Sequence, residues 1–390
     1  MKMKVKLGDV CNFYAGTGFP VAYQGKDSGE LPFYKVGDIA NNVSVGKTYL
    51  ELCNNYISRE DARVIKGVIV PKGTVVFAKI GEALKLNRRA ITSCDCLIDN
   101  NAMGIAPISS FLKEKYFFYY MKHLKMQELA ESTTVPSVRK SKLEAVIIEV
   151  PTIQEQEKIE NQLDKISDII IMRKQQLQQL DDLVKARFVE MFGDPTDIRL
   201  SRVPLIEYVE NTKYGTSQPP QFDENGCFKF IRATNIKSGH INEKDMLFIS
   251  KEESEKIGKC KLNGGEIIIV RSGANTGDTC VITDEYKGQY AGYDIIVTLK
   301  TDKLNPVFLN ELINIPRYMK TVVKPLTARS AQPHLNTQQV QSLPILVVDI
   351  DKQKEFAVFV EQIDKSKVAV QKALDEAQIL FDSLMQEYFG

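Results

Sequence analysis

The chain has 390 residues, of which 43% are hydrophobic and 26% charged, and its formal net charge at pH 7 is +1. At roughly 100–200 residues per domain, this length allows two to four globular domains, and the composition excludes a disordered chain. No run of 18 apolar residues occurs, and no apolar core follows the basic start at Met1–Lys6. We therefore expect neither a transmembrane helix nor a secretory signal.

Cysteine and histidine lack the spacing of a disulfide or metal framework. The seven cysteines are scattered, and the nearest pair is Cys94 and Cys96. The three histidines, His123, His240 and His334, lie far apart, and no Cys-x-x-Cys occurs. We expect reduced thiols, a cytoplasmic location and no metal ion bound by this chain.

The first segment, residues 1–135, is predicted to be a globular α/β domain. It holds 18 basic and 13 acidic side chains, a net charge of +5. The run from Gly73 to Gly81 combines a turn glycine, a short β-rich apolar stretch, Lys79 and a second glycine. This pattern predicts a buried strand that ends in an exposed loop, and residues 111–130 are predicted to be helical.

Residues 136–193, with a net charge of −1, are predicted to contain a long helix over about 154–191. Apolar side chains recur at steps of four and three, which keeps one stripe facing a partner helix as in a coiled coil. Arg173 and Arg187 occupy two steps of this stripe and can pair with acidic residues on the facing helix. Gly193 suits the position after the end of a helix. The stripe consists of Ile159, Leu163, Ile166, Ile170, Leu177, Leu180 and Val184.

Residues 194–332, with a net charge of +1, repeat the first segment with small insertions. The Gly-Thr pair at 16–17 recurs at 215–216, and the strand-and-loop run recurs at 265–273 with an arginine at the basic position. Residues 307–320 are predicted to be helical, with an interruption at the proline.

Residues 333–390, with a net charge of −4, are predicted to contain a second long helix over about 351–388. It shows the same apolar stripe, and only Lys367 departs from it. The stripe consists of Phe356, Val360, Ile363, Val370, Leu374 and Phe381.

The two helical segments are copies of one another. A shift of 197 positions aligns 136–193 with 333–390 without a gap, and 11 of the 58 positions are identical. Chance would give roughly three or four identities in such a comparison. The simplest fold is therefore two mixed α/β (α+β) domains with pseudo-twofold symmetry, separated by two long antiparallel coiled-coil helices of one chain. Pairing of each helix with a second chain stays open as an alternative.

Two stretches resemble parts of enzyme active sites but lack their essential residues. Residues 16–19 resemble the glycine turn that binds S-adenosylmethionine, yet Pro20 follows where a helix should open. Residues 218–222 resemble the catalytic loop of an amino-methyltransferase, but no Asn or Asp leads them. No phosphate-binding loop and no nucleophile motif occurs. We expect no catalytic residue and no cofactor in this chain.

The order of the segments resembles the specificity subunit of a Type I restriction-modification enzyme, and the resemblance covers the whole chain. Its most telling local match begins at residues 133–138, continues with an apolar strand up to Pro151, and ends with Gln-Glu-Gln at 154–156, which opens the helix. The second copy departs from the pattern, because Val348 and Lys352 replace the proline and the glutamate.

This resemblance implies a non-catalytic subunit that reads a bipartite sequence in double-stranded DNA. Target-recognition domains at 1–135 and 194–332 would each read one half, and helical regions at 136–193 and 333–390 would set the gap and dock the modification subunits. It further implies two modification (methyltransferase) subunits that carry S-adenosylmethionine and methylate adenine. Restriction (nuclease and translocase) subunits that use ATP and Mg would complete the assembly.

Reading of the major groove requires polar or basic side chains on exposed loops, and phosphate contacts favour a basic surface. Arg271 stands between an apolar strand and a Ser-Gly turn, which makes it the strongest single candidate for a DNA contact. The full set of expected DNA-binding residues is Thr17, Lys79, Arg88, Arg89 and Arg139 in the first domain and Thr216, Ser217, Arg232, Asn235, Arg271, Ser272, Asn275 and Arg329 in the second.

Two other functions stay open. One is a cytosolic scaffold whose helices hold two protein-binding domains apart, and the other is a fused DNA methyltransferase with its own S-adenosylmethionine site. Uptake of that cofactor by the isolated chain would identify the methyltransferase. A salt-dependent DNA complex would exclude the scaffold.

Overall fold

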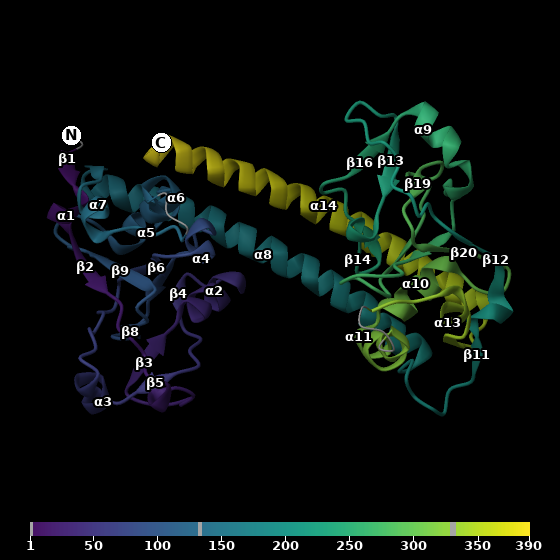
Figure 1. Ribbon diagram of the computed structural model, residues 1–390, viewed down its shortest axis with the longest axis horizontal. Helices are drawn as coiled ribbons and strands as arrows, with labels where there is room; N and C mark the ends of the chain where they lie inside the picture. The colour runs from purple at the N-terminus through teal and green to yellow at the C-terminus, as the bar shows by residue number, and fades with distance from the viewer. Residues whose placement is uncertain (1–2, 132–134, 328–332) are drawn as a thin grey trace. The chain divides into compact units, whose positions relative to one another are not determined.

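The computed structural model describes residues 3–131, 135–327 and 333–390. The chain divides into two compact units: unit 1 comprises Met1–Gln175 and Lys372–Gly390, and unit 2 comprises Gln176–Gln371. Each unit holds one globular part and a section of both long helices, α8 (Ile153–Phe192) and α14 (Ile350–Phe389) (Figure 1). The predicted division at residues 135, 193 and 332 stays a prediction.

The globular part of unit 1 contains a five-stranded sheet, a three-stranded sheet and a strand pair. The five-stranded sheet has the order β2-β9-β6-β7-β4, and the three-stranded sheet has the order β5-β3-β8. The strands are β1 (Met3–Lys6), β2 (Cys11–Ala15), β3 (Leu31–Tyr34), β4 (Tyr49–Leu50), β5 (Tyr56–Ile57), β6 (Val75–Ala78), β7 (Ala90–Thr92), β8 (Leu97–Ile98), β9 (Ala102–Pro107) and β10 (Ile147–Val150). β1 pairs with β10 in antiparallel fashion.

The globular part of unit 2 has a four-stranded sheet of order β12-β20-β17-β18, a three-stranded sheet of order β16-β13-β19 and two strand pairs. The strands are β11 (Arg202–Pro204), β12 (Val209–Tyr214), β13 (Phe228–Ile231), β14 (Ile236–Lys237), β15 (His240–Ile241), β16 (Leu247–Ile249), β17 (Ile267–Ile269), β18 (Thr279–Val281), β19 (Tyr290–Ala291), β20 (Ile295–Leu299) and β21 (Pro344–Leu346). The pairs are β11 with β21 and β14 with β15.

The two units repeat one topology. The run β2-β9-β6-β7 corresponds to β12-β20-β17-β18, the order β5-β3-β8 corresponds to β16-β13-β19, and β1-β10 corresponds to β11-β21. The central strands β6 and β17 are completely buried, because all their residues are apolar and both faces are covered. The predicted doubled α/β architecture is confirmed.

Short helices connect the strands. The predicted helix at 111–130 is found as α5 and α6. The predicted helix at 307–320 breaks at Ile315, after which Pro316 begins α11. A π-helical turn (Met319–Val323) then leads into α12. The short helices are α1 (Leu7–Val10), α2 (Val36–Ser44), α3 (Arg59–Val64), α4 (Glu82–Lys85), α5 (Glu114–His123), α6 (Met126–Leu129), α7 (Lys140–Glu144), α9 (Lys251–Lys256), α10 (Pro306–Asn314), α11 (Pro316–Tyr318), α12 (Lys324–Thr327) and α13 (Thr337–Gln341).

The long helices α8 and α14 run in opposite directions within each unit (Figure 1). In unit 1, the hydroxyl of Tyr388 donates to Oε1 of Gln162 at 2.6 Å. In unit 2, Nζ of Lys367 lies 2.7 Å from Oδ1 of Asp181. None of the predicted stripe residues is exposed. α8 ends at Phe192 because the next residue, Gly193, adopts a φ of +81°, which favours glycine.

The helices also belong to the cores of the globular parts. In unit 2, Phe188 of α8 stacks on Phe308 of α10 at 5.3 Å between ring centroids and meets Phe356 of α14 edge-on at 5.4 Å. In unit 1, Tyr116 of α5 lies 5.3 Å from Phe389 of α14. Since each aromatic pair buries a large apolar area, each globular part is held on its section of the helix pair.

Candidate nucleic-acid interface

A close approach of two loops occurs at the same place in both units. A Cβ added to Gly16 would lie 1.7 Å from the carbonyl oxygen of Asp99, and one added to Gly215 would lie 1.7 Å from that of Gly292. Only glycine fits these positions. In each unit the next residue forms an isolated parallel β-bridge with the residue that this glycine approaches: Thr17 with Asp99, and Thr216 with Gly292.

Next to this turn, the central strand of each sheet ends at a basic residue. Lys79 directly follows β6, and Arg271 stands two residues after the end of β17. The carbonyl of Lys79 accepts a hydrogen bond from the amide of Val138 at 3.0 Å, and that of Arg271 accepts one from Leu335 at 2.8 Å. Lys79 and Arg271 therefore occupy equivalent positions in one backbone frame.

The guanidinium group of Arg271 is held from several sides. Its Cζ lies 4.1 Å from the ring centroid of Tyr293 and 5.3 Å from that of Tyr214. Its Nη2 lies 2.9 Å from Nε2 of His334. Because an arginine can only donate, Nε2 of His334 accepts this hydrogen bond. Nη1 is buried and has no hydrogen-bond partner among the residues that the structure describes.

The backbone of Arg271 is fixed by a buried carboxylate. Its amide donates to Oδ1 of Asp294 at 2.9 Å. Asp294 is only 3% exposed, and burial raises its pKa from 3.8 to about 6, although the amide and the charge of Arg271 oppose this shift. Since burial penalises the charged form, this carboxylate is retained at a cost to stability at neutral pH.

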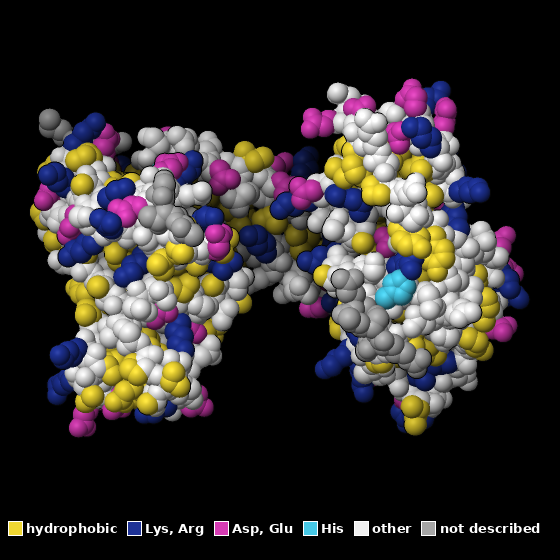
Figure 2. All heavy atoms as spheres, viewed as in Figure 1, with side chains coloured by type: hydrophobic (Ala, Val, Ile, Leu, Met, Phe, Trp, Pro, Cys, Tyr) yellow, Lys and Arg dark blue, Asp and Glu magenta, His cyan; other side chains and the backbone are white. Residues whose placement is uncertain are grey.

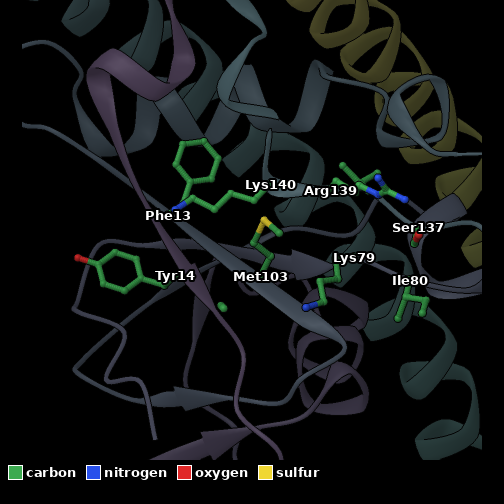
Figure 3. Close-up of a pocket in the computed structure, with 10 residues that line it drawn as sticks. Phe13, Tyr14, Lys79, Ile80, Met103, Ser137, Arg139 and Lys140 are labelled. Atoms are coloured by element: carbon green, nitrogen blue, oxygen red, sulfur yellow. The ribbon is translucent and has the colours of Figure 1, made fainter. Parts of the chain in front are cut away.

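The equivalent place in unit 1 is an open recess of about 340 Å³. Figure 3 shows Met103 at its centre, between Phe13 and Lys140 on one side and Lys79 on the other. Within the described part of the chain, the ammonium group of Lys79 forms no ion pair. The recess thus combines an apolar floor with a free cation. Its lining is Phe13, Tyr14, Ala15, Lys79, Ile80, Met103, Ser137, Val138, Arg139 and Lys140.

The other candidates of unit 1 differ in their surroundings. Arg139 lines the recess and pairs with Glu131, with Nε 2.9 Å from Oε1. Thr17 is buried, and its hydroxyl accepts from the amide of Val68. Arg88 is half-buried on the loop before β7. The buried Arg89 stacks on Phe77, and burial lowers its pKa to about 9.

In unit 2, three candidates border the Arg271 group and three hold loops together. Thr216, Ser217 and Ser272 belong to the loops beside Tyr214 and Arg271, and the two serines are exposed. Asn235 is buried and accepts from the amide of Arg232, whose guanidinium group binds the carbonyl of Asp245. Asn275 donates to the carbonyls of Ala233 and Ile236. Arg329 lies outside the described residues.

Sequence reasoning did not find the side chains that surround Arg271. Tyr214, Tyr293 and His334 come from three separate parts of the chain, and no local spacing connects them. The position of Tyr214 directly before the Gly-Thr turn was an available signal. Tyr293 and His334 become neighbours only through the sheet pairing and the return of the chain before α13.

Charge and ligand patterns add little to this geometry. On the face shown in Figure 2, Lys and Arg side chains are interspersed with Asp and Glu on both units. Among the described residues, no group of three or more His, Cys, Asp and Glu is placed to hold a metal ion. No described helix is long and apolar enough to cross a membrane.

Comparison of the sequence with known proteins gives a consistent result. The family model for the Type I restriction modification DNA specificity domain matches residues 2–182 and 205–378. The EcoKI specificity subunit of Escherichia coli K12 is 19% identical over 67% of this chain and 60% of that subunit. The MjaIX specificity subunit of Methanocaldococcus jannaschii is 21% identical over 92% of this chain and 85% of that subunit.

Solved structures show the same fold. The S subunit of a Type I restriction-modification system from M. genitalium matches with a TM-score of 0.61 and 13% identity, over 100% of this chain and 96% of that one. A structure that concerns complex assembly and conformational transition of the type I R-M system matches with a TM-score of 0.53 and 15% identity, over 100% of this chain and 97% of that one. The chain belongs to the family of Type I restriction-modification specificity subunits.

Proposed function

We propose that this chain selects the DNA target of a Type I restriction-modification complex, with the globular part of each unit reading one half of a bipartite sequence. The observation that carries the proposal is the repeated frame at Lys79 and Arg271. In both units a glycine turn and the end of a buried strand present a donor-only side chain on a fixed backbone. Two copies of one reading frame match a target with two halves.

The proposed contact residues are those that border the frame and are exposed or half-buried. They are Lys79 and Arg139 in unit 1 and Thr216, Ser217, Arg271 and Ser272 in unit 2. The polar side chains of five other candidates form hydrogen bonds within the protein, so these residues support the loops. They are Thr17, Arg89, Arg232, Asn235 and Asn275. Arg88 and Arg329 stay candidates.

The partners and cofactors are also proposed. We assign methylation to two modification subunits with S-adenosylmethionine, and cleavage to restriction subunits with ATP and Mg. Arg187 on α8 reaches Glu355 on α14 at 3.5 Å, which supports a role in helix pairing more than in docking a partner. All seven cysteines are free thiols, which supports a reducing, cytoplasmic location.

The test is methylome sequencing of the host with and without this gene, together with assays of the purified chain. We expect adenine methylation at a two-part motif with a fixed gap, only when the gene is present. The chain alone should neither bind S-adenosylmethionine nor methylate DNA. With modification subunits it should form a salt-dependent DNA complex.

Two variants sharpen this test. Lys79→Ala should weaken DNA binding by the complex, because it removes a cation of the recess that forms no ion pair with the described residues. Lys4→Ala is the control, since Lys4 is an exposed residue that pairs with Glu149 outside the recess. Uptake of S-adenosylmethionine by the chain alone would identify a fused methyltransferase, and absence of DNA binding with partners would favour a scaffold.

A further inference from the structure

We infer that Arg271 reads a guanine in the half-site of unit 2 and that His334 is its positioning residue. This inference rests on the proposed function and names one nucleobase of the target. It starts from the difference between Arg271 and Lys79, which share one frame but have different neighbours.

The neighbours correspond pairwise between the units. Tyr214 precedes the Gly-Thr turn where unit 1 has Ala15. Asp99 and Gly292 correspond as the residues opposite the glycine turns, so the next residue, Asn100, stands where unit 2 has Tyr293. Single antiparallel bridges join Ile80 to Ser137 and Ser272 to His334, so Ser137 stands where unit 2 has His334. An alanine, an asparagine and a serine therefore take the places in unit 1 of the three groups that restrain Arg271.

These differences decide how each cation is held. Lys79 borders an open recess, and its ammonium group forms no ion pair with any of the described residues. The guanidinium plane of Arg271 is fixed by the Tyr293 ring at 4.1 Å, and its rotation within that plane is fixed by His334 at 2.9 Å. A phosphate clamp needs charge and little orientation, so a lysine serves it well. A guanidinium plane with a fixed orientation instead suits hydrogen bonds whose strength depends on geometry, such as those to the edge of a base.

Base chemistry selects the ligand. A guanidinium group presents parallel N–H donors and no acceptor. In the major groove, guanine alone offers two adjacent acceptors, N7 and O6, whereas adenine and cytosine present an amino donor and thymine a methyl group. Among the residues that the structure describes, Nη1 of Arg271 has no hydrogen-bond partner. Tyr214 and Tyr293 are themselves 37% and 46% exposed, so the group borders the surface from which a base edge approaches.

The experiment uses the complex of the full chain with its modification subunits and a DNA library in which both half-sites are randomised. Methylated products are sequenced. Wild type should prefer guanine at one position of one half-site by roughly 10-fold or more. Arg271→Ala and Arg271→Lys should both reduce that preference to roughly 3-fold or less, and Arg271→Lys should retain most of the overall affinity.

His334 and Lys79 supply the matched controls. His334→Ala should lower the guanine preference at the same position, and His334→Asn, whose side-chain oxygen can accept from Arg271, should restore part of it. Lys79→Ala should leave this position unchanged. A variant that unfolds at the same temperature as the wild type is correctly folded. If Arg271→Ala does not fold, the base preference of Arg271→Lys tests the inference.

Two results would overturn the inference. One is a loss of affinity that is equal for all sequences, with the slope of log affinity against log salt reduced by about one, which is the mark of a phosphate contact. The other is an unchanged guanine preference in both Arg271 variants. The proposed function fails separately, if the wild-type complex yields no two-part motif at all.

Discussion

Gln156 and Gln353 occupy the same position near the start of the two long helices, and both are buried. Oε1 of Gln353 accepts from the amide of Asn305 at 2.9 Å, and its Nε2 donates to the carbonyl of Val348 at 2.8 Å. Gln156 makes the equivalent bonds to the amide of Lys113 and the carbonyl of Pro151. Each glutamine thus connects its helix to the loop before the globular part's own helix.

Replacement of Gln353 with leucine should destabilise the chain by roughly 2–3 kcal/mol, because the amide of Asn305 and the carbonyl of Val348 would lose their hydrogen bonds to a buried side chain. The free energy of unfolding from urea titration checks this value. Gln362→Leu is the control, since Gln362 is exposed on the same helix, and its effect should stay within about 0.5 kcal/mol. Equal effects of the two substitutions would contradict the bonding role of Gln353.

Asp294 should make stability depend on pH. Its pKa is about 6 in the folded chain against an ordinary value of 3.8, so the folded state binds the proton more tightly than the unfolded state. The stability from this group is present at low pH and is lost as the pH rises through 6. The loss between pH 5 and pH 8 is on the order of 1–2 kcal/mol.

The variant Asp294→Asn cannot ionise but keeps an acceptor for the amide of Arg271. Relative to wild type, its free energy of unfolding should therefore improve by roughly 1–2 kcal/mol from pH 5 to pH 8. Denaturant titrations of both proteins at a series of pH values measure the difference. A constant difference across this range would show that Asp294 titrates in the folded chain as it does in the unfolded one.

At the scale of the helices, Lys367 replaces an apolar residue in the stripe of α14. It is 17% exposed in its side chain and pairs with Asp181 on α8 at 2.7 Å and with Asp364 at 3.3 Å. A half-buried ion pair between the two helices fixes their register, because slippage would leave the charges unpaired.

Lys367→Ala should cost roughly 1–3 kcal/mol, since it leaves two carboxylates without their shared cation. Lys365→Ala provides the control two residues away, because Lys365 is 72% exposed and, among the described residues, forms an ion pair with Glu361 of its own helix alone. That change should cost less than about 0.5 kcal/mol. Thermal or urea unfolding ranks the two variants, and the reverse ranking would contradict a role of Lys367 in register.

Sequence patterns predicted the elements better than the site, for a physical reason. The helices expected at 154–191 and 351–388 are observed at Ile153–Phe192 and Ile350–Phe389, because a sustained apolar period leaves few alternatives. The strand ends at Lys79 and Arg271 carried a local signal. The stack on Arg271 carried none, because its tyrosines and histidine meet only after the sheets have formed.

At the scale of the molecule, the proposal assigns the gap between the half-sites to the helix pair. Removal of 172–178 from α8 and 370–376 from α14 deletes one heptad from each helix and keeps both apolar stripes in phase. At 1.5 Å per residue this shortens the pair by about 10 Å, which corresponds to a gap shorter by about three base pairs. Methylation of a gap-randomised library measures the change.

Deletion of 172–178 alone is the matched control, because it removes one heptad from a single helix and leaves α8 and α14 unequal in length. This variant should lose specific methylation. If the double deletion instead kept the original gap, the helices would not determine the spacing.

The central claim is that each globular part reads its own half of the target. The amides of Leu7 and Leu205 bind the carbonyls of Val146 and Leu343 at 2.8 and 2.9 Å, so residues 7–146 can replace 205–343 at matched junctions. Sequencing of the methylation made by this chimera with the modification subunits tests the claim. We predict a motif whose two halves are the same sequence in inverted orientation, with the original gap. A chimera that still selects the wild-type second half, or a continuous motif in either protein, would contradict the account.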